Sequence, residues 1–107
     1  MQLVKEVYSV LDFLPNQEKF ALSDQIRRAV VSIPSNIAEG YSRNSDREFL
    51  QFLYIARGSK SELETQLEIA KMLGYLKGNQ LQEINVLLEE IGKMLNKLIS
   101  TIKKANN

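Results

Sequence analysis

The side chains best placed to do chemistry in this sequence lie between Leu22 and Arg43, where polar residues accompany an apolar helical pattern. Apolar residues recur there every three or four positions, which predicts the buried stripe of one helix: Leu22, Ile26, Ala29, Val30, Ile33 and Ile37. Several polar residues run beside this stripe: Gln25, Arg28, Ser32, Ser35, Asn36 and Glu39. Because buried polar groups need partners, this segment is the best clue to function.

The composition argues against most kinds of catalysis. Among 107 residues there is no histidine and no cysteine, so the usual general base, the commonest metal ligand and the most reactive nucleophile are all missing. A carboxylate metal site of the ferritin type needs Glu-x-x-His pairs, which this chain cannot form. Ser32 and Ser59 have no adjacent base in the pattern. We therefore predict a protein that is not an enzyme, with no cofactor, no metal and no small-molecule substrate.

The elements that position these residues are predicted to be four helices, and no strand pattern competes with them. The expected helices cover residues 2–13, 24–39, 46–73 and 79 onward. The last helix carries an unbroken apolar seam from Leu81 to Ile102 at alternating spacings of three and four. Because the connections are short, we predict one domain over residues 1–107, an all-α, antiparallel up-down four-helix bundle with a Pro-kinked second helix.

Helix boundaries follow from local signals. Pro34 removes one backbone hydrogen bond, which predicts the kink in the second helix. Gly40 and Gly74 are predicted to be the left-handed residues that end the second and third helices. Ser45 and Glu48 have the spacing of a capping box at the start of the third helix.

Antiparallel pairing of the second and third helices brings their polar residues opposite one another. With the turn centred near residue 43, Arg28 lies within one helical turn of Glu62, and we predict an ion pair between them. Glu39 opposes the helix dipole, and Arg43 or Arg47 is its nearest counter-charge. The predicted structural polar network comprises Gln25, Arg28, Asn36, Glu39, Ser59, Glu62 and Gln66. The alternative interpretation is that these residues form a polar groove or a subunit contact.

Basic residues are concentrated near one end of the predicted bundle. The formal charge of the chain is only +1, so their distribution matters more than the total. Antiparallel geometry places the end of the fourth helix beside the turn between the second and third. The predicted contacts for an anion or a nucleic acid are Arg27, Arg43, Arg47, Lys97, Lys103 and Lys104. The alternative is that lysines near a helix C-terminus are solvated residues that suit the dipole.

Apolar residues in the third helix exceed what one core can bury. Its first turns contain Phe49, Leu50, Phe52, Leu53, Tyr54 and Ile55, which cannot all face the same side. This favours self-association, and the alternative is a protein partner that meets Phe52 or Tyr54. No apolar run approaches the ~18 residues of a membrane span, and the start MQLVKEVYSVL lacks a signal-peptide core. We therefore expect a cytoplasmic protein with no membrane association.

Several short motifs together resemble one known family. They are Gln25–Ala29 (QIRRA), Ser32–Pro34 (SIP), Asn36–Gly40 (NIAEG), Ala56–Ser59 (ARGS) and Ser61–Leu63 (SEL). Residues Val7, Tyr8, Phe13, Pro15 and Leu73–Leu76 also fit its pattern. The chain is similar over nearly its whole length to the 23S rRNA-intervening sequence proteins, which are simple four-helix bundles. It departs from them before Leu3, where members often carry a further turn or two of helix.

The resemblance implies a bacterial protein that assembles into a ring-shaped homo-oligomer, a pentamer, with no enzymatic activity. The family is named for genes lying within insertions of large ribosomal RNA genes. A distant relative, the accessory protein of diversity-generating retroelements, is a basic pentamer that binds nucleic acid and a reverse transcriptase. The resulting prediction is a homo-oligomeric scaffold that binds RNA or a ribonucleoprotein through its basic end. The alternative is a protein interaction module with no nucleic-acid ligand.

Overall fold

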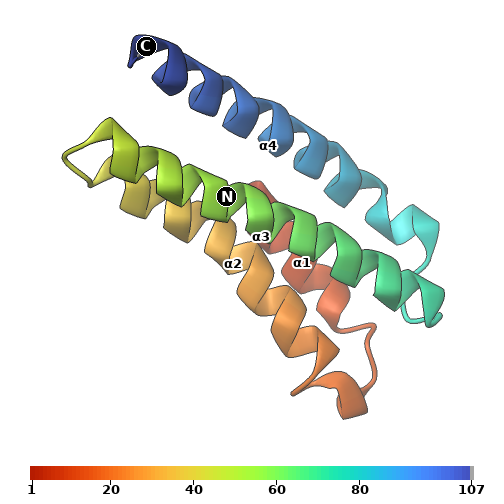
Figure 1. Cartoon of the computed structure of the whole chain (residues 1–107). Coiled ribbons are helices and arrows are strands. Elements are labelled where there is room, and N and C mark those ends of the chain that lie inside the picture. The colour runs from red at the N-terminus through yellow and green to blue at the C-terminus, as the bar shows by residue number, and fades with distance from the viewer. Residues whose placement is uncertain (107) are drawn as a thin grey trace.

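A computed structural model of the chain describes residues 1–106, and within them the regular structure is entirely helical. The helices are α1 (Gln2–Leu11), a short 3-10 turn (Asn16–Glu18), α2 (Leu22–Tyr41), α3 (Asp46–Met72) and α4 (Gly78–Ala105). Figure 1 shows α2 lying along α3, with α4 beyond α3 and the short α1 behind. α1 contacts both α2 and α4. The prediction of an all-α fold with four helices is confirmed, and each boundary lies within two residues of the expected one.

Local signals explain how α3 begins and ends. Ser45 Oγ accepts a hydrogen bond of 3.2 Å from the backbone N–H of Glu48, which is the first half of the predicted capping box. Gly74 follows α3 with φ of 82°, as predicted, since glycine adopts this left-handed conformation without a steric penalty. The N–H of Tyr75 then donates to the carbonyl of Ala70 at 2.9 Å and closes the last turn.

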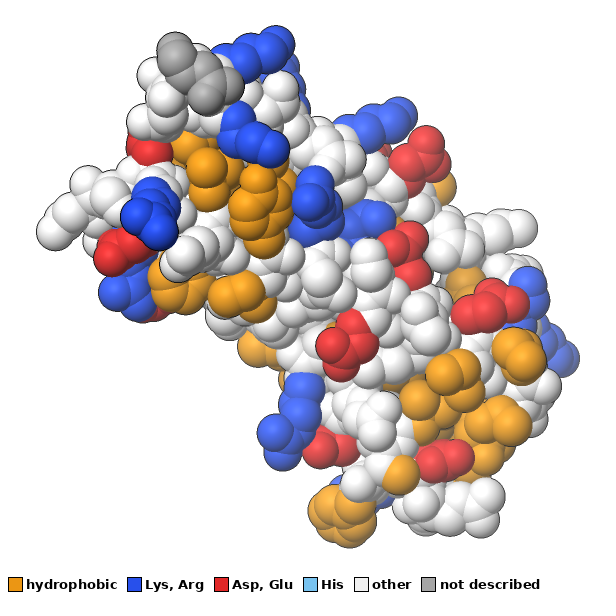
Figure 2. Space-filling view, viewed as in Figure 1, with side chains coloured by type: hydrophobic (Ala, Val, Ile, Leu, Met, Phe, Trp, Pro, Cys, Tyr) orange, Lys and Arg blue, Asp and Glu red, His pale blue; other side chains and the backbone are white. Residues whose placement is uncertain are grey.

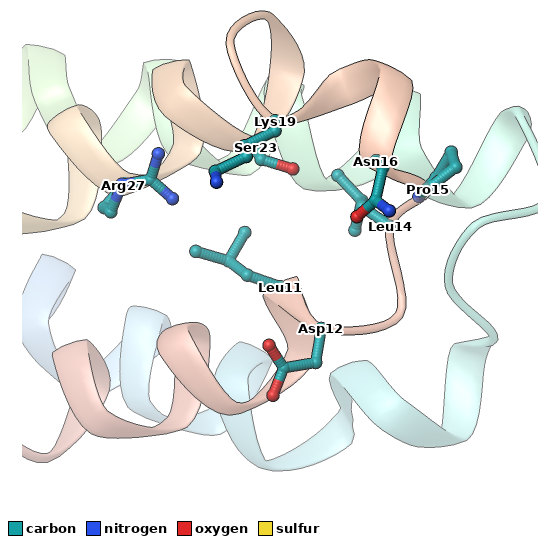
Figure 3. Close-up of a pocket in the computed structure, with 8 residues that line it drawn as sticks. All are labelled: Leu11, Asp12, Leu14, Pro15, Asn16, Lys19, Ser23 and Arg27. Atoms are coloured by element: carbon teal, nitrogen blue, oxygen red, sulfur yellow. The ribbon is translucent and has the colours of Figure 1, made fainter.

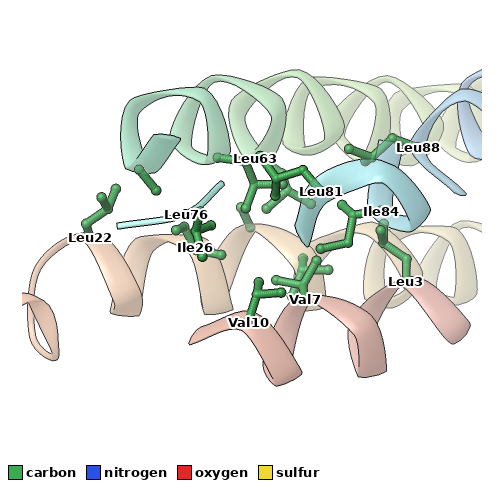
Figure 4. Packing of buried hydrophobic residues seen from close by; sticks show 14 of the residues in the cluster. Leu3, Val7, Val10, Leu22, Ile26, Leu63, Leu76, Leu81, Ile84 and Leu88 are labelled. Atoms are coloured by element: carbon green, nitrogen blue, oxygen red, sulfur yellow. The ribbon is translucent and has the colours of Figure 1, made fainter. Parts of the chain in front are cut away.

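The hydrophobic core has two parts because α1 is much shorter than the other helices. The larger cluster includes Leu3, Val7 and Val10, which point from α1 toward residues of α2, α3 and α4 such as Ile26 and Ile84 (Figure 4). The smaller cluster lies where the first helix does not reach, and its buried members are Leu53, Ala56, Leu95 and Ile99. α3 and α4 therefore hold each other directly over this second half.

Gly40 does not have the predicted role. α2 continues through it to Tyr41, and within residues 1–106 Gly74 alone has positive φ. Gly40 is buried against α3, and a Cβ there would lie 2.8 Å from Phe49 Cδ1 and 3.1 Å from Phe52 Cβ. The position needs glycine for close packing of two helices rather than for a turn. α2 also continues past Pro34, where the kink stays a prediction.

Candidate functional site

One hydrogen-bonded group joins the middles of α2 and α3. Ser32 Oγ and Ser59 Oγ are 2.8 Å apart, across the helix pair. The Nδ2 group of Asn36 donates to Ser32 Oγ at 2.9 Å and to the Ser32 carbonyl at 2.8 Å. Two members of the predicted polar network, Asn36 and Ser59, are therefore connected through Ser32. These bonds occupy both serine hydroxyls and the Nδ2 group of Asn36.

The predicted ion pair between Arg28 and Glu62 is wrong. Arg28 Nε donates to Asp24 Oδ2 at 2.9 Å, one turn earlier on the same helix, and its side chain is 80% exposed. Glu62 instead accepts from Gln66 Nε2 at 3.1 Å on its own helix. The Ser32–Ser59 contact sets a register in which Arg28 lies opposite residues 62–63, but its exposed side chain bonds to the nearer carboxylate of Asp24. Gln25 is also exposed.

The two remaining members of the predicted network have separate environments. Gln66 is only 5% exposed, and within residues 1–106 its Oε1 atom is buried without a hydrogen-bond partner. Glu39 forms an ion pair with Arg43, one of the two partners predicted for it. The guanidinium of Arg43 also lies 4.8 Å from the ring centroid of Phe52. The polar residues thus form several local groups rather than one continuous network.

Most of the predicted basic residues come together at one end of the molecule. The end of α4 is tied to the start of α3, because Asn106 Nδ2 donates to Asp46 Oδ2 at 2.9 Å. Figure 1 shows the C-terminus beside the α2–α3 turn, and Figure 2 shows Lys and Arg side chains gathered there. We define the basic end by its exposed cations: Arg43, Arg47, Lys97, Lys103 and Lys104.

Arg27 does not belong to this group. It lies near the start of α2, where its Nη2 is 3.4 Å from Asp24 Oδ1, and it borders a hollow between α1 and α2. Figure 3 shows Arg27 and Lys19 on one side of this hollow and Asp12 on the other. The hollow is lined by residues from the end of α1, the 3-10 turn and the start of α2.

A row of contacts between α3 and α4 was missed by the sequence reasoning. Arg57 Nη1 donates to Asn96 Oδ1 at 3.1 Å, and the Arg57 guanidinium lies 5.2 Å from the ring centroid of Tyr54. The Lys60 side chain passes over Gly92, where a Cβ would lie 2.9 Å from Lys60 Cε. An antiparallel alignment of the third and fourth predicted helices, like that of the second and third, would place these residues opposite one another.

Two further features bear on the class of protein. In the part of the chain that the structure describes, no group of three or more His, Cys, Asp or Glu side chains is arranged to hold a metal ion. No helix within residues 1–106 is both long enough and apolar enough to cross a membrane.

Comparison with known proteins places the chain in a family. The model of the 23S rRNA-intervening sequence protein family matches residues 1–97. A crystal structure of a protein of unknown function from the S23 ribosomal protein family of Bacteroides thetaiotaomicron has 32% identity and a TM-score of 0.82, with 92% of each chain covered. No curated protein matches this sequence. The family description names no enzymatic activity, and the solved relative is described as a protein of unknown function. The chain therefore belongs to the 23S rRNA-intervening sequence protein family.

Proposed function

We propose that this protein is a non-enzymatic homo-oligomeric scaffold that binds RNA or a ribonucleoprotein through its basic end. The observation that carries the proposal is the bond from Asn106 Nδ2 to Asp46 Oδ2, which holds the lysine-rich end of α4 against the start of α3. Two segments that are distant in sequence thereby present cations to the same region of solvent. The family description, which refers to intervening sequences of 23S rRNA, is consistent with an RNA ligand.

Charge accounts for how such an end would bind. Arg47, Lys97, Lys103 and Lys104 are all exposed, and Arg43 is partly committed to Glu39. Each cation that neutralises a phosphate releases a condensed counterion, so affinity falls as salt rises. Four such contacts to a single strand predict a loss of about 50-fold between 50 and 200 mM salt.

Exposed apolar side chains support assembly with copies of the same chain. Ile55 and Ile69 are exposed on α3, Leu73 is exposed directly after it, and Val31 is exposed on α2. Apolar groups left in water favour association when they form a patch on one surface. We infer that these faces meet in a closed homo-oligomer, and the pentameric ring is the form that the family resemblance implies.

Binding is tested with purified protein and a single-stranded RNA in a fluorescence anisotropy titration at several salt concentrations. The test variant reverses two charges at the basic end, Lys103→Glu with Lys104→Glu. Its control reverses two exposed lysines at the opposite end of the bundle, Lys71→Glu near the end of α3 with Lys77→Glu just before α4, and so has the same net charge. We expect only the first variant to lose affinity. Absence of salt-dependent binding by the wild-type protein, or equal loss in both variants, would contradict the RNA proposal.

The assembly is tested by measuring the solution mass by light scattering and native mass spectrometry, with and without nuclease treatment. A solution mass five times that of one chain supports the pentameric ring, and the mass of a monomer would contradict it. A partner protein that stays bound after nuclease treatment would favour the alternative, a protein interaction module without a nucleic-acid ligand.

A further inference from the structure

The outer seam between α3 and α4 combines an aromatic ring with a held guanidinium. The Arg57 guanidinium lies 5.2 Å from the ring centroid of Tyr54, within the range of a cation–π contact. Arg57 Nη1 also donates to Asn96 Oδ1 at 3.1 Å, so the arginine is held from both helices. Tyr54 is 38% exposed and therefore offers part of its ring to solvent.

This seam is continuous with the basic end. Three contacts between α3 and α4 share one antiparallel register: Lys60 with Gly92, Arg57 with Asn96, and Asp46 with Asn106. The same register places Lys103 opposite Leu50, about two turns from Asn96 on the same side of α4. Arg47 and Arg57 are then about 15 Å apart along α3, at 1.5 Å per residue. Figure 2 shows hydrophobic side chains bordered by Lys and Arg at this end of the molecule.

The chemistry of the seam differs from that of a simple phosphate patch. Phosphate binding alone would need only cations, whereas an exposed tyrosine beside an ordered arginine can stack an unpaired base. Bases in a duplex are already stacked on one another, so their faces are closed to such a ring. Arginine has five N–H donors, and the bond to Asn96 uses one of them. The Nδ2 donors of Asn96 take no part in that bond and can reach the edge of a base.

We propose that the seam formed by Tyr54, Arg57 and Asn96 binds unpaired nucleotides of RNA. Tyr54 stacks on a base, Arg57 contacts the adjoining phosphate, and the chain of phosphates continues toward Lys103 and the basic end. The inference rests on the proposed function, because it specifies which RNA is bound and where.

The test compares an oligouridine single strand with an RNA duplex of the same length, using the full chain and anisotropy titrations. The variants are Tyr54→Ala, Tyr54→Phe and Arg57→Ala, and Tyr8→Ala is the control because Tyr8 is an exposed tyrosine on α1. The solution mass and the thermal midpoint of each variant are measured alongside, so that loss of fold or assembly is seen directly.

We expect wild-type protein to bind the single strand more tightly than the duplex. Tyr54→Ala should lose about 5-fold to 150-fold in affinity for the single strand, since stacking of one base is worth that much, while Tyr54→Phe should keep most of the affinity. Arg57→Ala should also reduce the slope of log affinity against log salt by about 0.7, the value for one phosphate contact.

The outcomes separate this inference from the proposal on which it rests. If the wild-type protein shows salt-dependent binding but Tyr54→Ala binds as tightly as Tyr8→Ala, the seam is not the binding site. The proposal that RNA binds the basic end then still stands. Equal affinity for duplex and single strand also overturns the inference, as does a Tyr54→Ala variant whose solution mass falls together with its affinity. If the wild-type protein binds no RNA, both proposals fail.

Discussion

Replacing Gly40 with alanine tests whether close packing of α2 on α3 depends on this residue. A Cβ at Gly40 would lie 2.8 Å from Phe49 Cδ1 and 3.1 Å from Phe52 Cβ. The Phe49 ring is itself held against Tyr41, with 4.8 Å between the ring centroids. Phe52 Cβ is attached to the α3 backbone and cannot move unless the helix moves. The clash must therefore be relieved by displacing either a packed ring or a helix.

Two effects of opposite sign determine the change in the free energy of unfolding. Alanine in a helix interior is more favourable than glycine by about 1 kcal/mol. Overpacking a filled site costs about 1–3 kcal/mol. The net expectation for Gly40→Ala is a loss of about 0–2 kcal/mol, and each kcal/mol lowers the thermal midpoint by about 4–8 °C in a domain of this size.

Gly58→Ala is the matched control. Gly58 lies inside α3, and a Cβ there would have no neighbour within 4 Å. This substitution should raise stability by up to about 1 kcal/mol, because only the propensity term applies. The difference between the two variants isolates the overpacking cost. Both are measured by circular dichroism in thermal and urea unfolding at equal protein concentration, since assembly contributes to apparent stability. If Gly40→Ala is stabilised as much as Gly58→Ala, the packing argument is refuted.

Three further predictions use the same urea unfolding measurement. Gly74→Ala should lower the free energy of unfolding by about 1–2 kcal/mol, because φ of 82° is costly for a residue with a Cβ, and Gly74→Asn should lower it less. Equal stability of the wild-type protein and both variants would argue against the left-handed cap. Ser59→Ala should lower the free energy of unfolding by about 0.5–1.5 kcal/mol, because it removes the hydroxyl partner of Ser32. An unchanged urea midpoint would mean that water replaces this hydrogen bond fully. A double-mutant cycle of Arg28→Ala and Glu62→Ala should show a coupling below about 0.5 kcal/mol, because neither side chain contacts the other; a coupling of more than about 1 kcal/mol would restore the predicted ion pair.

Features encoded by neighbours in the chain were predictable. The third helix was expected at residues 46–73 and lies at Asp46–Met72, since its Ser45 cap and its terminal Gly74 act within a few residues. Arg43 was also one of the two partners foreseen for Glu39, and residues four apart on a helix face the same side. These predictions need only the geometry of one helix.

Features that depend on the rotation of one helix against another were not predictable in the same way. Arg28 and Glu62 are near each other in register, yet the direction of Arg28 from α2 sends it to Asp24. Gly40 could serve either a left-handed turn or a close approach of helices, and both uses look identical in sequence. Only the position of Phe49 relative to α2 distinguishes them.

The sequence by itself determined the four helices, their order and the family, because periodicity, caps and motifs are local properties of the chain. The tertiary structure decided which polar residues are partners and that Tyr54, Arg57 and Asn96 share one surface. The physical reason is that an antiparallel pair can be aligned from residue numbers, whereas the direction of each side chain depends on how the helices pack. The candidate site lies on two helices whose contacting residues are dozens of positions apart, so it exists only after that packing is complete.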